Sequence, residues 1–442
     1  MIDRSAEWIA SAAGGRLVGG EASERGPRRA VVDSREAGDG DLFVGLRGEN
    51  EDGGRFAATA LAAGAWGAIV SPEHAGALEA SGRPAIAAAD PLAALQSLAL
   101  EWRRELAAPV VGITGSTGKT STKDILAALL RSRWPGTHAN RENLNTEIGL
   151  PLTILAAERG TEALVLEMAM RGAGQIAELT AIAEPDVGLI VNVGPVHLEL
   201  LGTVERVAAA KAELIRDLRP GSACVVPANE PLLAPHLRDD LDTVTFGEGG
   251  DVRLVSLHDG EARIDARGTE VTLELPYSEA HNVLNTVAAV AAATALGVVP
   301  GGPVAVSFSS LRGEIVDLGG GVTVVNDCYN ANPMSMHAAL EHLAGTPAER
   351  RIAVLGTMAE LGRDGERFHR EIGRHADELG VDVLVTVGES ALPFGDDFDG
   401  EKHAVASPEE ARAILEELAR PGDRVLIKGS RSAGLERVVG AA

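Results

Sequence analysis

The chain has 442 residues, of which 45% are hydrophobic, 24% charged and only 3% aromatic, and its formal net charge is −24 at pH 7. This length predicts about three globular domains of roughly 150 residues each. The negative charge argues against binding to nucleic acid or to an anionic membrane, because such partners require basic patches.

Residues 1–107 are predicted to form a small α/β domain. Its expected elements are strands at 30–33, 41–44 and 68–70 and helices at 56–63 and 92–106. The first residues lack a basic stretch followed by an apolar one, so no signal peptide is predicted. With only two cysteines, Cys224 and Cys328, a reducing cytoplasmic location is expected.

A glycine-rich loop opens the second domain, residues 108–311. An apolar run at 109–111 precedes the loop and a helical pattern at 123–130 follows it. Strand, glycine loop and helix form the context of a phosphate-binding loop, in which backbone N–H groups and a helix N-terminus face an anion. Lys119 would reach the terminal phosphates and the Thr120 hydroxyl would bind Mg²⁺.

The spacing of this loop differs from the usual phosphate-loop pattern. Ile113 stands where the first glycine is expected, and Gly112, Gly115 and Gly118 recur at intervals of three residues instead. The alternative is therefore a glycine-rich turn with a solvent-exposed lysine. The residues predicted to bind the nucleotide phosphates are Gly115, Ser116, Thr117, Gly118, Lys119, Thr120 and Ser121.

The rest of the second domain predicts a doubly wound sheet. Apolar strands are expected at 163–166, 187–191 and 223–226, antiparallel strands within 251–276, and a closing helix at 281–295. The longest segment without a charged side chain, Ala280 to Leu311, contains polar residues and proline. It predicts a buried helix and loop, not a membrane span.

Polar residues follow two of these strands, where ligands of an open α/β sheet bind. Glu167 and His197 could hold a divalent metal beside the phosphates, although Mg²⁺ prefers oxygen and a loop histidine is more often simply hydrogen-bonded. Lys211 lies in a predicted helix, and by pattern alone it is a solvated lysine.

The third domain, residues 312–442, is predicted to be a second α/β sheet, so the fold class is α/β throughout. Its strands are expected at 322–325, 351–355, 383–385 and 424–427.

Polar groups also follow two strands of the third domain. Asp327 could bind ribose hydroxyls, and Asn330 and Asn332 could present amides to a peptide, or Asn332 could merely cap a helix. Lys428 and Arg431 could meet an anionic substrate or belong to a solvated loop.

Taken together, these motifs resemble the Mur ligase family along essentially the whole chain. The segment from Gly112 to Thr120 matches the Gly-x-x-Gly-x-x-Gly-Lys-Thr pattern of that family, which accounts for the unusual spacing. The other matching segments are Asp33 to Arg35, Asp41 to Val44, Gly48, Asn143 to Pro151, Asn192 to Glu199, His281 to Asn285, Tyr329 to Pro333 and Glu360 to Gly362.

The resemblance implies roles at matching positions. The implied catalytic residues are Lys119, Lys211 and His197. Two Mg²⁺ ions would be bound by Thr120, Glu167, His197 and a carbamylated Lys211. ATP would be bound by the phosphate loop together with Asn282, Arg312 and Asp327. Residues matching substrate-binding positions are Ser34, Arg35, Asn143, Asn145, Thr146, Asn330, Asn332, Lys428 and Arg431.

The resemblance also implies the reaction. The segments at Tyr329 and Glu360 are the most specific, and they indicate a cytoplasmic, monomeric enzyme of peptidoglycan synthesis that adds D-alanyl-D-alanine to UDP-N-acetylmuramoyl-tripeptide with ATP. Two alternatives remain open. One is a sibling ligase, or a folylpolyglutamate synthase, with a different acceptor, and the other is a nucleotide-binding scaffold without catalytic activity.

Overall fold

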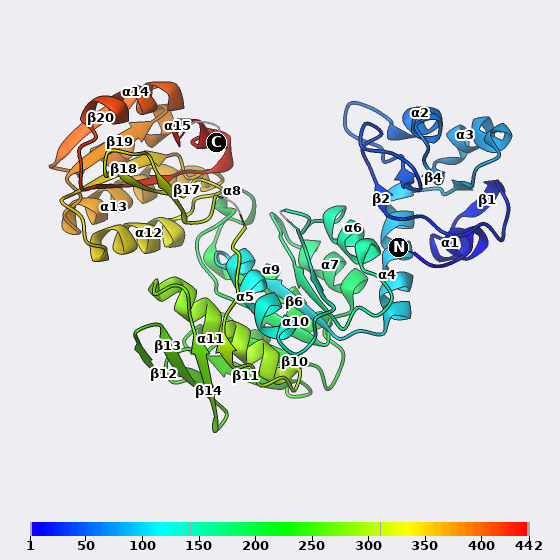
Figure 1. Ribbon diagram of the computed structural model, residues 1–442, viewed down its shortest axis with the longest axis horizontal. Helices are drawn as coiled ribbons and strands as arrows, with labels where there is room; N and C mark the ends of the chain where they lie inside the picture. Colours follow the sequence, from blue (N-terminus) through cyan, green and yellow to red (C-terminus); the bar gives the residue numbers. More distant parts are fainter. Residues whose placement is uncertain (1, 142, 310, 440–442) are drawn as a thin grey trace.

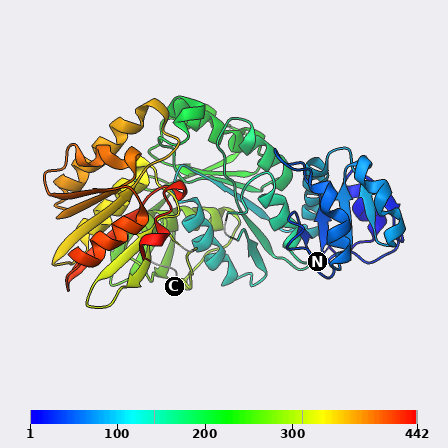
Figure 2. The ribbon, with the colours of Figure 1, turned by 90° about the horizontal axis from the view of Figure 1, so that it is seen from above.

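The computed structural model describes residues 2–141, 143–309 and 311–439. Figures 1 and 2 show three lobes, each built on its own sheet, with the middle lobe between the N-terminal and C-terminal lobes. Within each sheet most neighbouring strands are parallel, and helices cover the sheets. The predicted α/β fold class is therefore confirmed.

The N-terminal sheet has the strand order β1-β5-β4-β3-β2, and only β1 runs antiparallel to its neighbour. Its strands are β1 (Arg16–Gly19), β2 (Ala30–Val31), β3 (Leu42–Val44), β4 (Gly67–Val70) and β5 (Ala85–Ala87). Its helices are α1 (Ala6–Ala12), η1 (Gly53–Phe56), α2 (Ala57–Ala62), α3 (Pro72–Ala75) and η2 (Gly76–Ser81). Three of these strands were expected, but the short β1 and β5 were not.

Helix α4 (Pro91–Leu106) joins the first two lobes. Asp90 caps it by accepting hydrogen bonds from the N–H groups of Leu92 and Ala93, and Pro91 occupies its first turn. Its buried residues recur at helical spacing and pack into a core that also contains residues of the middle lobe. The Trp102 indole is fully buried and donates to the Ala157 carbonyl oxygen at 2.9 Å. The two lobes thus share one hydrophobic core.

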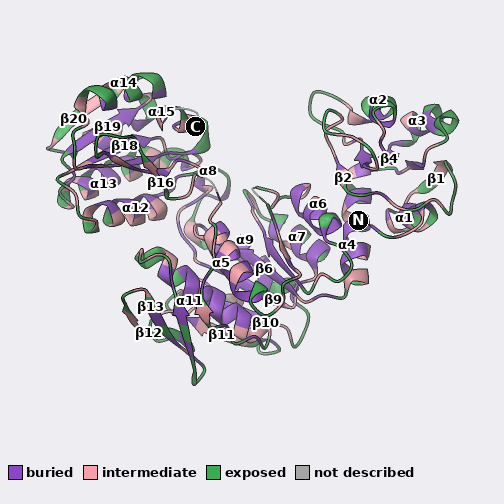
Figure 3. Cartoon of the chain, viewed as in Figure 1, coloured by how far each residue is buried: buried purple, intermediate pink, exposed green. Residues whose placement is uncertain are grey.

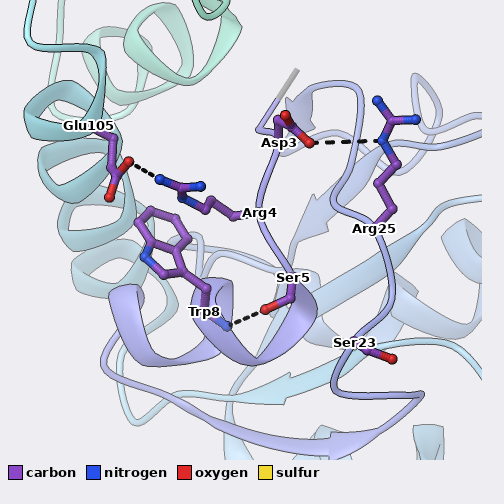
Figure 4. Close-up of a pocket in the computed structure, with 7 residues that line it drawn as sticks. All are labelled: Asp3, Arg4, Ser5, Trp8, Ser23, Arg25 and Glu105. Carbon is purple, nitrogen blue, oxygen red and sulfur yellow. Dashed lines mark hydrogen bonds and ion pairs between the residues drawn. The ribbon is translucent and has the colours of Figure 1, made fainter.

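A pocket lies where the start of the chain meets α4 (Figure 4). Arg4 forms an ion pair with Glu105 of α4, and its guanidinium lies over the Trp8 ring, 5.8 Å from the ring centroid. Arg25 and Asp3 lie 4.0 Å apart across the pocket. The Arg4–Glu105 pair thus links the first residues to α4, whereas the Arg25–Asp3 pair joins two segments of the N-terminal lobe.

The middle sheet has the order β15-β14-β13-β12-β11-β10-β9-β6-β8-β7. Its strands are β6 (Val110–Thr114), β7 (Thr137–Ala139), β8 (Ala163–Glu167), β9 (Val187–Ile190), β10 (Ala223–Pro227), β11 (Asp242–Phe246), β12 (Val252–His258), β13 (Glu261–Ala266), β14 (Thr269–Glu274) and β15 (Gly302–Pro303). The strands from β7 to β12 pair in parallel, whereas β13 is antiparallel to both β12 and β14, as predicted.

Helices cover both faces of this sheet. They are α5 (Lys119–Arg131), α6 (Gly149–Ala156), α7 (Gln175–Ala183), α8 (Leu198–Leu201), α9 (Val204–Lys211), α10 (Glu213–Asp217), η3 (Ala234–His236) and α11 (Ala280–Ala295). Successive strand residues such as Val110 and Val111 point to opposite faces and join different cores. One core includes α5 and α11, and the other includes α4, α6 and α7. Figure 3 shows this buried interior.

The C-terminal sheet has the order β16-β17-β21-β18-β19-β20, with only β16 antiparallel to its neighbour. Its strands are β16 (Glu314–Asp317), β17 (Thr323–Asp327), β18 (Arg350–Gly356), β19 (Val383–Val387), β20 (Glu401–Val405) and β21 (Asp423–Lys428). Its helices are α12 (Pro333–Gly345), η4 (Gly362–Asp364), α13 (Gly365–Glu378), η5 (Glu389–Gly395), α14 (Pro408–Leu418), η6 (Arg431–Ala433) and α15 (Glu436–Val439). The edge strands β16 and β20 were not expected.

Within the described ranges, no helix combines the length and apolar character needed to cross a membrane. Helix α11 begins the segment without charged side chains and is largely buried, as predicted. Residue 310 of that segment lies outside the described residues.

Replacing Trp102 by alanine is expected to lower the free energy of unfolding of the first two lobes by about 3–5 kcal/mol, because a buried ring is lost. The Ala157 carbonyl would also lose its donor. Urea unfolding followed by circular dichroism measures the effect. Trp102→Phe keeps most of the ring and should cost about 1–3 kcal/mol. An unchanged unfolding midpoint in Trp102→Ala would contradict the shared core.

Candidate active site

The predicted phosphate loop lies at the carboxyl ends of three adjacent parallel strands. Strand β6 pairs with β8 on one side and β9 on the other, and the loop connects β6 to α5. Glu167 is the last residue of β8, and His197 lies in the segment that follows β9. The topology therefore brings together residues about 80 positions apart in the sequence, at the edge where open α/β sheets bind ligands.

Gly118 has a left-handed conformation (φ 75°) at the N-cap of α5. A Cβ atom there would lie 2.7 Å from Asn285 Oδ1 of α11, so both the conformation and the space require glycine. Asn192, which follows β9, accepts hydrogen bonds at its Oδ1 from the N–H groups of Ser116 and Thr117 at 3.1 and 3.0 Å. Asn285 and Asn192 thus shape the loop. Both lie in segments that the sequence analysis singled out, but neither received a role there.

Lys119 begins α5, and its Nζ donates to the Gly115 carbonyl oxygen at 2.9 Å. The surrounding protein lowers the pKa of this amine chiefly by desolvation. The Glu167 carboxylate opposes that shift and the Arg312 guanidinium adds to it, so both charges act on Lys119. The alternative of a solvent-exposed lysine on a glycine turn does not fit this environment.

Glu167 is buried, and each of its carboxylate oxygens accepts a hydrogen bond. Its Oε2 accepts a hydrogen bond from the Thr120 hydroxyl at 2.9 Å, and its Oε1 accepts one from Asn145 Nδ2 at 2.8 Å. Asn140 Oδ1 accepts the Glu167 backbone N–H at 2.5 Å, which fixes the end of β8. Thr120 and Glu167, two predicted metal ligands, are therefore in direct contact and offer the oxygen atoms that Mg²⁺ prefers.

Lys211 is only 1% exposed, so the pattern-based interpretation as a solvated lysine is wrong. Desolvation holds the pKa of its amine well below the ordinary lysine value, and the positive charge of Lys119 lowers it further. The helix pattern failed because a lysine at the buried end of the alanine-rich helix α9 looks locally like any surface lysine.

His197 adopts a left-handed backbone conformation (φ 54°) immediately before α8. Burial lowers the pKa of its imidazole, and the charges of Lys211 and Lys119 lower it further. Glu360 of the C-terminal lobe acts in the opposite direction, through a hydrogen bond with Nδ1. Desolvation is the largest of these effects, so the ring stays neutral near pH 7, the form in which histidine binds metals.

Three further residues predicted to contact ATP lie around the entrance to α11 and the start of the C-terminal lobe. Asn282 Oδ1 is buried without a hydrogen-bond partner among the described residues, an acceptor suited to a ligand amino group. The Arg312 guanidinium lies over the Tyr329 ring, 4.3 Å from its centroid. Asp327 ends β17 and pairs with Lys428 Nζ at 2.6 Å. The glycine loop that ends at Gly118 and the unpaired Oδ1 of Asn282 therefore fit an adenine nucleotide.

The C-terminal lobe touches the phosphate loop directly. Asn332 caps α12 by accepting the Ser335 N–H at 3.0 Å, as the capping alternative predicted, while its Nδ2 donates to the Ser116 carbonyl oxygen at 3.4 Å. A Cβ atom on Gly194 would lie 1.9 Å from Met334 Sδ, so the chain after β9 approaches α12 closely.

The remaining residues predicted to bind substrate are distributed over three regions. Asn330 accepts a hydrogen bond from the buried Lys428 ammonium through its carbonyl oxygen at 3.1 Å, whereas the Arg431 side chain is mostly exposed. Lys428 thus points at Asp327 and the chain after β17. Asn143 and Thr146 flank Asn145 in the loop before α6.

Ser34 and Arg35 follow β2 in the N-terminal lobe, whereas the phosphate loop precedes α5 in the middle lobe (Figure 1). The exposed Arg35 guanidinium pairs with Asp33 at 2.5 Å and holds the pKa of that carboxyl at about 2. The residues predicted to bind ATP and metal therefore lie together around the phosphate loop, whereas Ser34 and Arg35 lie in the N-terminal lobe.

Comparisons with known proteins agree with this arrangement. Residues 113–293 match the Mur ligase middle domain, and residues 311–431 match the Mur ligase, glutamate ligase domain. The UDP-N-acetylmuramoyl-tripeptide–D-alanyl-D-alanine ligase of Synechocystis is 38% identical over 92% of this chain and 90% of its own length.

Two solved structures are similar over most of their length. The crystal structure of MurF from Acinetobacter baumannii has a TM-score of 0.86 and 30% identity, covering 98% of this chain and 97% of that one. The structure of MurF ligase from Thermotoga maritima in complex with ADP has a TM-score of 0.81 and 32% identity, covering 93% and 96%. With this similarity over nearly its full length, the chain belongs to the Mur ligase family.

Proposed function

We propose that the chain is an ATP-dependent ligase that joins D-alanyl-D-alanine to UDP-N-acetylmuramoyl-tripeptide, giving the pentapeptide precursor of peptidoglycan. The observation that carries this proposal is the contact between Thr120 and Glu167 beside Lys119, at the carboxyl ends of β6 and β8. The acceptor follows from full-length similarity to ligases that carry this name and from the segments at Tyr329 and Glu360.

The reaction has two steps in this proposal. The terminal carboxylate of the tripeptide attacks the γ-phosphorus of ATP, which releases ADP and forms an acyl phosphate. The amine of D-alanyl-D-alanine then attacks the acyl carbon, and phosphate leaves from a tetrahedral intermediate. Lys119 stabilises the charge that develops on the transferring phosphoryl group, and the backbone N–H groups at the start of α5, which no side chain among the described residues caps, orient it.

Two Mg²⁺ ions would be held by Thr120, Glu167, His197 and Lys211, with Lys211 carbamylated. When bound, Mg²⁺ neutralises negative charge on the phosphates. The lowered pKa of Lys211 supports the carbamate, because only a neutral amine attacks CO₂. The new N–C bond gives an anionic carbamate and one released proton, and it converts a buried neutral amine into an anionic oxygen ligand.

The neighbouring lobes would keep water from the acyl phosphate. Asn332 and Met334 of the C-terminal lobe lie against the phosphate loop and the chain after β9, which supports a site closed between lobes. In this proposal the enzyme acts as a monomer. The two buried free cysteines, Cys224 and Cys328, are consistent with the proposed cytoplasmic location.

The decisive experiment is phosphate release from MgATP with UDP-N-acetylmuramoyl-tripeptide, with and without D-alanyl-D-alanine. Release that requires both substrates, with the pentapeptide product identified by mass, is expected. Release with a free amino acid in place of the dipeptide would indicate a sibling ligase. ATP binding without turnover under every condition would favour the scaffold.

Lys119→Ala is expected to reduce kcat by about 10²–10³-fold, since it removes a charge that acts on the transferring phosphoryl group. The unfolding midpoint should change little, because among the described residues the amine makes one hydrogen bond, to the Gly115 carbonyl. The matched control is Lys402→Ala, whose lysine lies on the edge strand β20 and donates to the carbonyl oxygens of Gly395 and Phe398 in its own lobe. Near-normal turnover in Lys119→Ala would refute the phosphate-loop assignment.

Lys211 is expected to give a carbamate signal in ¹³C NMR after incubation with ¹³C-bicarbonate at neutral pH. Because its pKa is depressed, the amine is neutral where an ordinary lysine is protonated. Acidification through this depressed pKa protonates the amine, so both the signal and ligase activity should fall together. Lys211→Met should lack the signal. A signal that persists in this variant would place the carbamate on another amine.

A further inference from the structure

Glu360 joins the C-terminal lobe to His197, although the two residues are 163 positions apart in sequence. Its Oε2 accepts a hydrogen bond from His197 Nδ1, and its Oε1 lies 3.5 Å from Arg171 Nε. Arg171 follows β8, so the carboxylate spans the segments after two strands of the middle sheet. No role was assigned to this side chain by the reaction described above.

The backbone reinforces this contact. The Glu360 carbonyl oxygen accepts a hydrogen bond at 3.1 Å from the N–H of Glu199, the second residue of α8. His197 and Glu360 both have positive φ, 54° and 62°, a conformation that non-glycine residues rarely adopt. Gly362 also has positive φ, and a Cβ atom there would lie 3.1 Å from Glu199 Cα. The segment 360–362 therefore packs closely against the segment 197–199, with little room for another arrangement.

This contact has a chemical consequence for the imidazole. A carboxylate can only accept a hydrogen bond, so it selects the tautomer of His197 with the proton on Nδ1. The lone pair is then on Nε2, the atom left available to a metal ion. Metal-binding histidines commonly have their second nitrogen fixed in this way, and loss of the partner typically lowers metal affinity 10–100-fold.

We propose that Glu360 is a positioning residue that fixes the tautomer and ring orientation of His197, so that the metal site is complete only when the C-terminal lobe is docked. This inference rests on the proposed function for its use of the metal. The C-terminal lobe, which carries four of the predicted substrate-binding residues (Asn330, Asn332, Lys428 and Arg431), thus also assembles part of the phosphoryl-transfer site. Phosphoryl transfer would be slow until that lobe is in place.

The test begins with the tautomer, which is independent of ligase activity. In protein labelled with ¹⁵N-histidine, free of nucleotide and metal, the His197 signals are assigned by their absence in His197→Gln. The wild-type protein should show the Nδ1-protonated tautomer, and Glu360→Ala should lose this preference. Glu360→Gln keeps an acceptor oxygen and should restore it. Because this readout needs no turnover, it stands even if the ligase assay fails.

The second readout is the binding of Mn²⁺, measured by electron paramagnetic resonance with a non-hydrolysable ATP analogue. Glu360→Ala should raise the dissociation constant of one Mn²⁺ ion, the one that His197 would hold, by about 10-fold or more, and Glu360→Gln should stay within a few-fold of wild type. In phosphate release, the Mg²⁺ concentration for half-maximal rate should rise similarly, with kcat at saturating Mg²⁺ much less affected.

Glu401→Ala provides a matched control, since Glu401 also contacts a histidine, His403 at 2.9 Å, but within strand β20 of the same lobe. It should leave the His197 tautomer and Mn²⁺ affinity unchanged. The proposal is overturned if Glu360→Ala retains both wild-type properties. It is also overturned if a folded Glu360→Gln loses them as completely as Glu360→Ala, because the acceptor oxygen would then not be what positions the ring.

Discussion

The placement of two amines and one carboxylate in the same desolvated region constrains the whole central site. Desolvation lowers the pKa of both amines, the charge of Lys119 lowers that of Lys211 further, and Glu167 supplies a compensating charge to Lys119. Burying charge without compensation is costly, so such a site is best suited to anionic ligands. The side-chain amides of Asn140 and Asn145 hold Glu167 in place. Binding of an anion would then change the electrostatic environment of the two amines.

The parallel sheet explains how this concentration of charge arises. Strands β8, β6 and β9 are neighbours in space but separated by helices in sequence, so the segments that follow them converge on one edge. Each segment contributes a different kind of group: a carboxylate after β8, a glycine loop and amine after β6, and an amide and imidazole after β9. The C-terminal lobe completes this edge through Asn332 and Glu360.

Local patterns predicted most of the fold and the centre of the site, because buried strands and the glycine loop are marked by apolar runs and spacing. They did not predict β16 and β20, whose exposed edges carry charged residues such as Glu314 and Lys402. Burial of Lys211 is a tertiary property that helical periodicity does not encode. The contact between His197 and Glu360 depends on the docking of two lobes, so no local pattern reveals it.

Helix α4 also limits how the N-terminal lobe can be exchanged between related proteins. Its side chains are part of a core that extends from Ile2 to residues of the middle sheet, and its Trp102 and Arg103 donate to carbonyl groups of the middle lobe. A recombination point placed before α4 would give the new lobe a foreign helix to pack on, whereas one placed after α4 would place a foreign helix against the apolar surface of the middle lobe. Evolution of the N-terminal lobe is therefore tied to the helix that anchors it to the middle lobe.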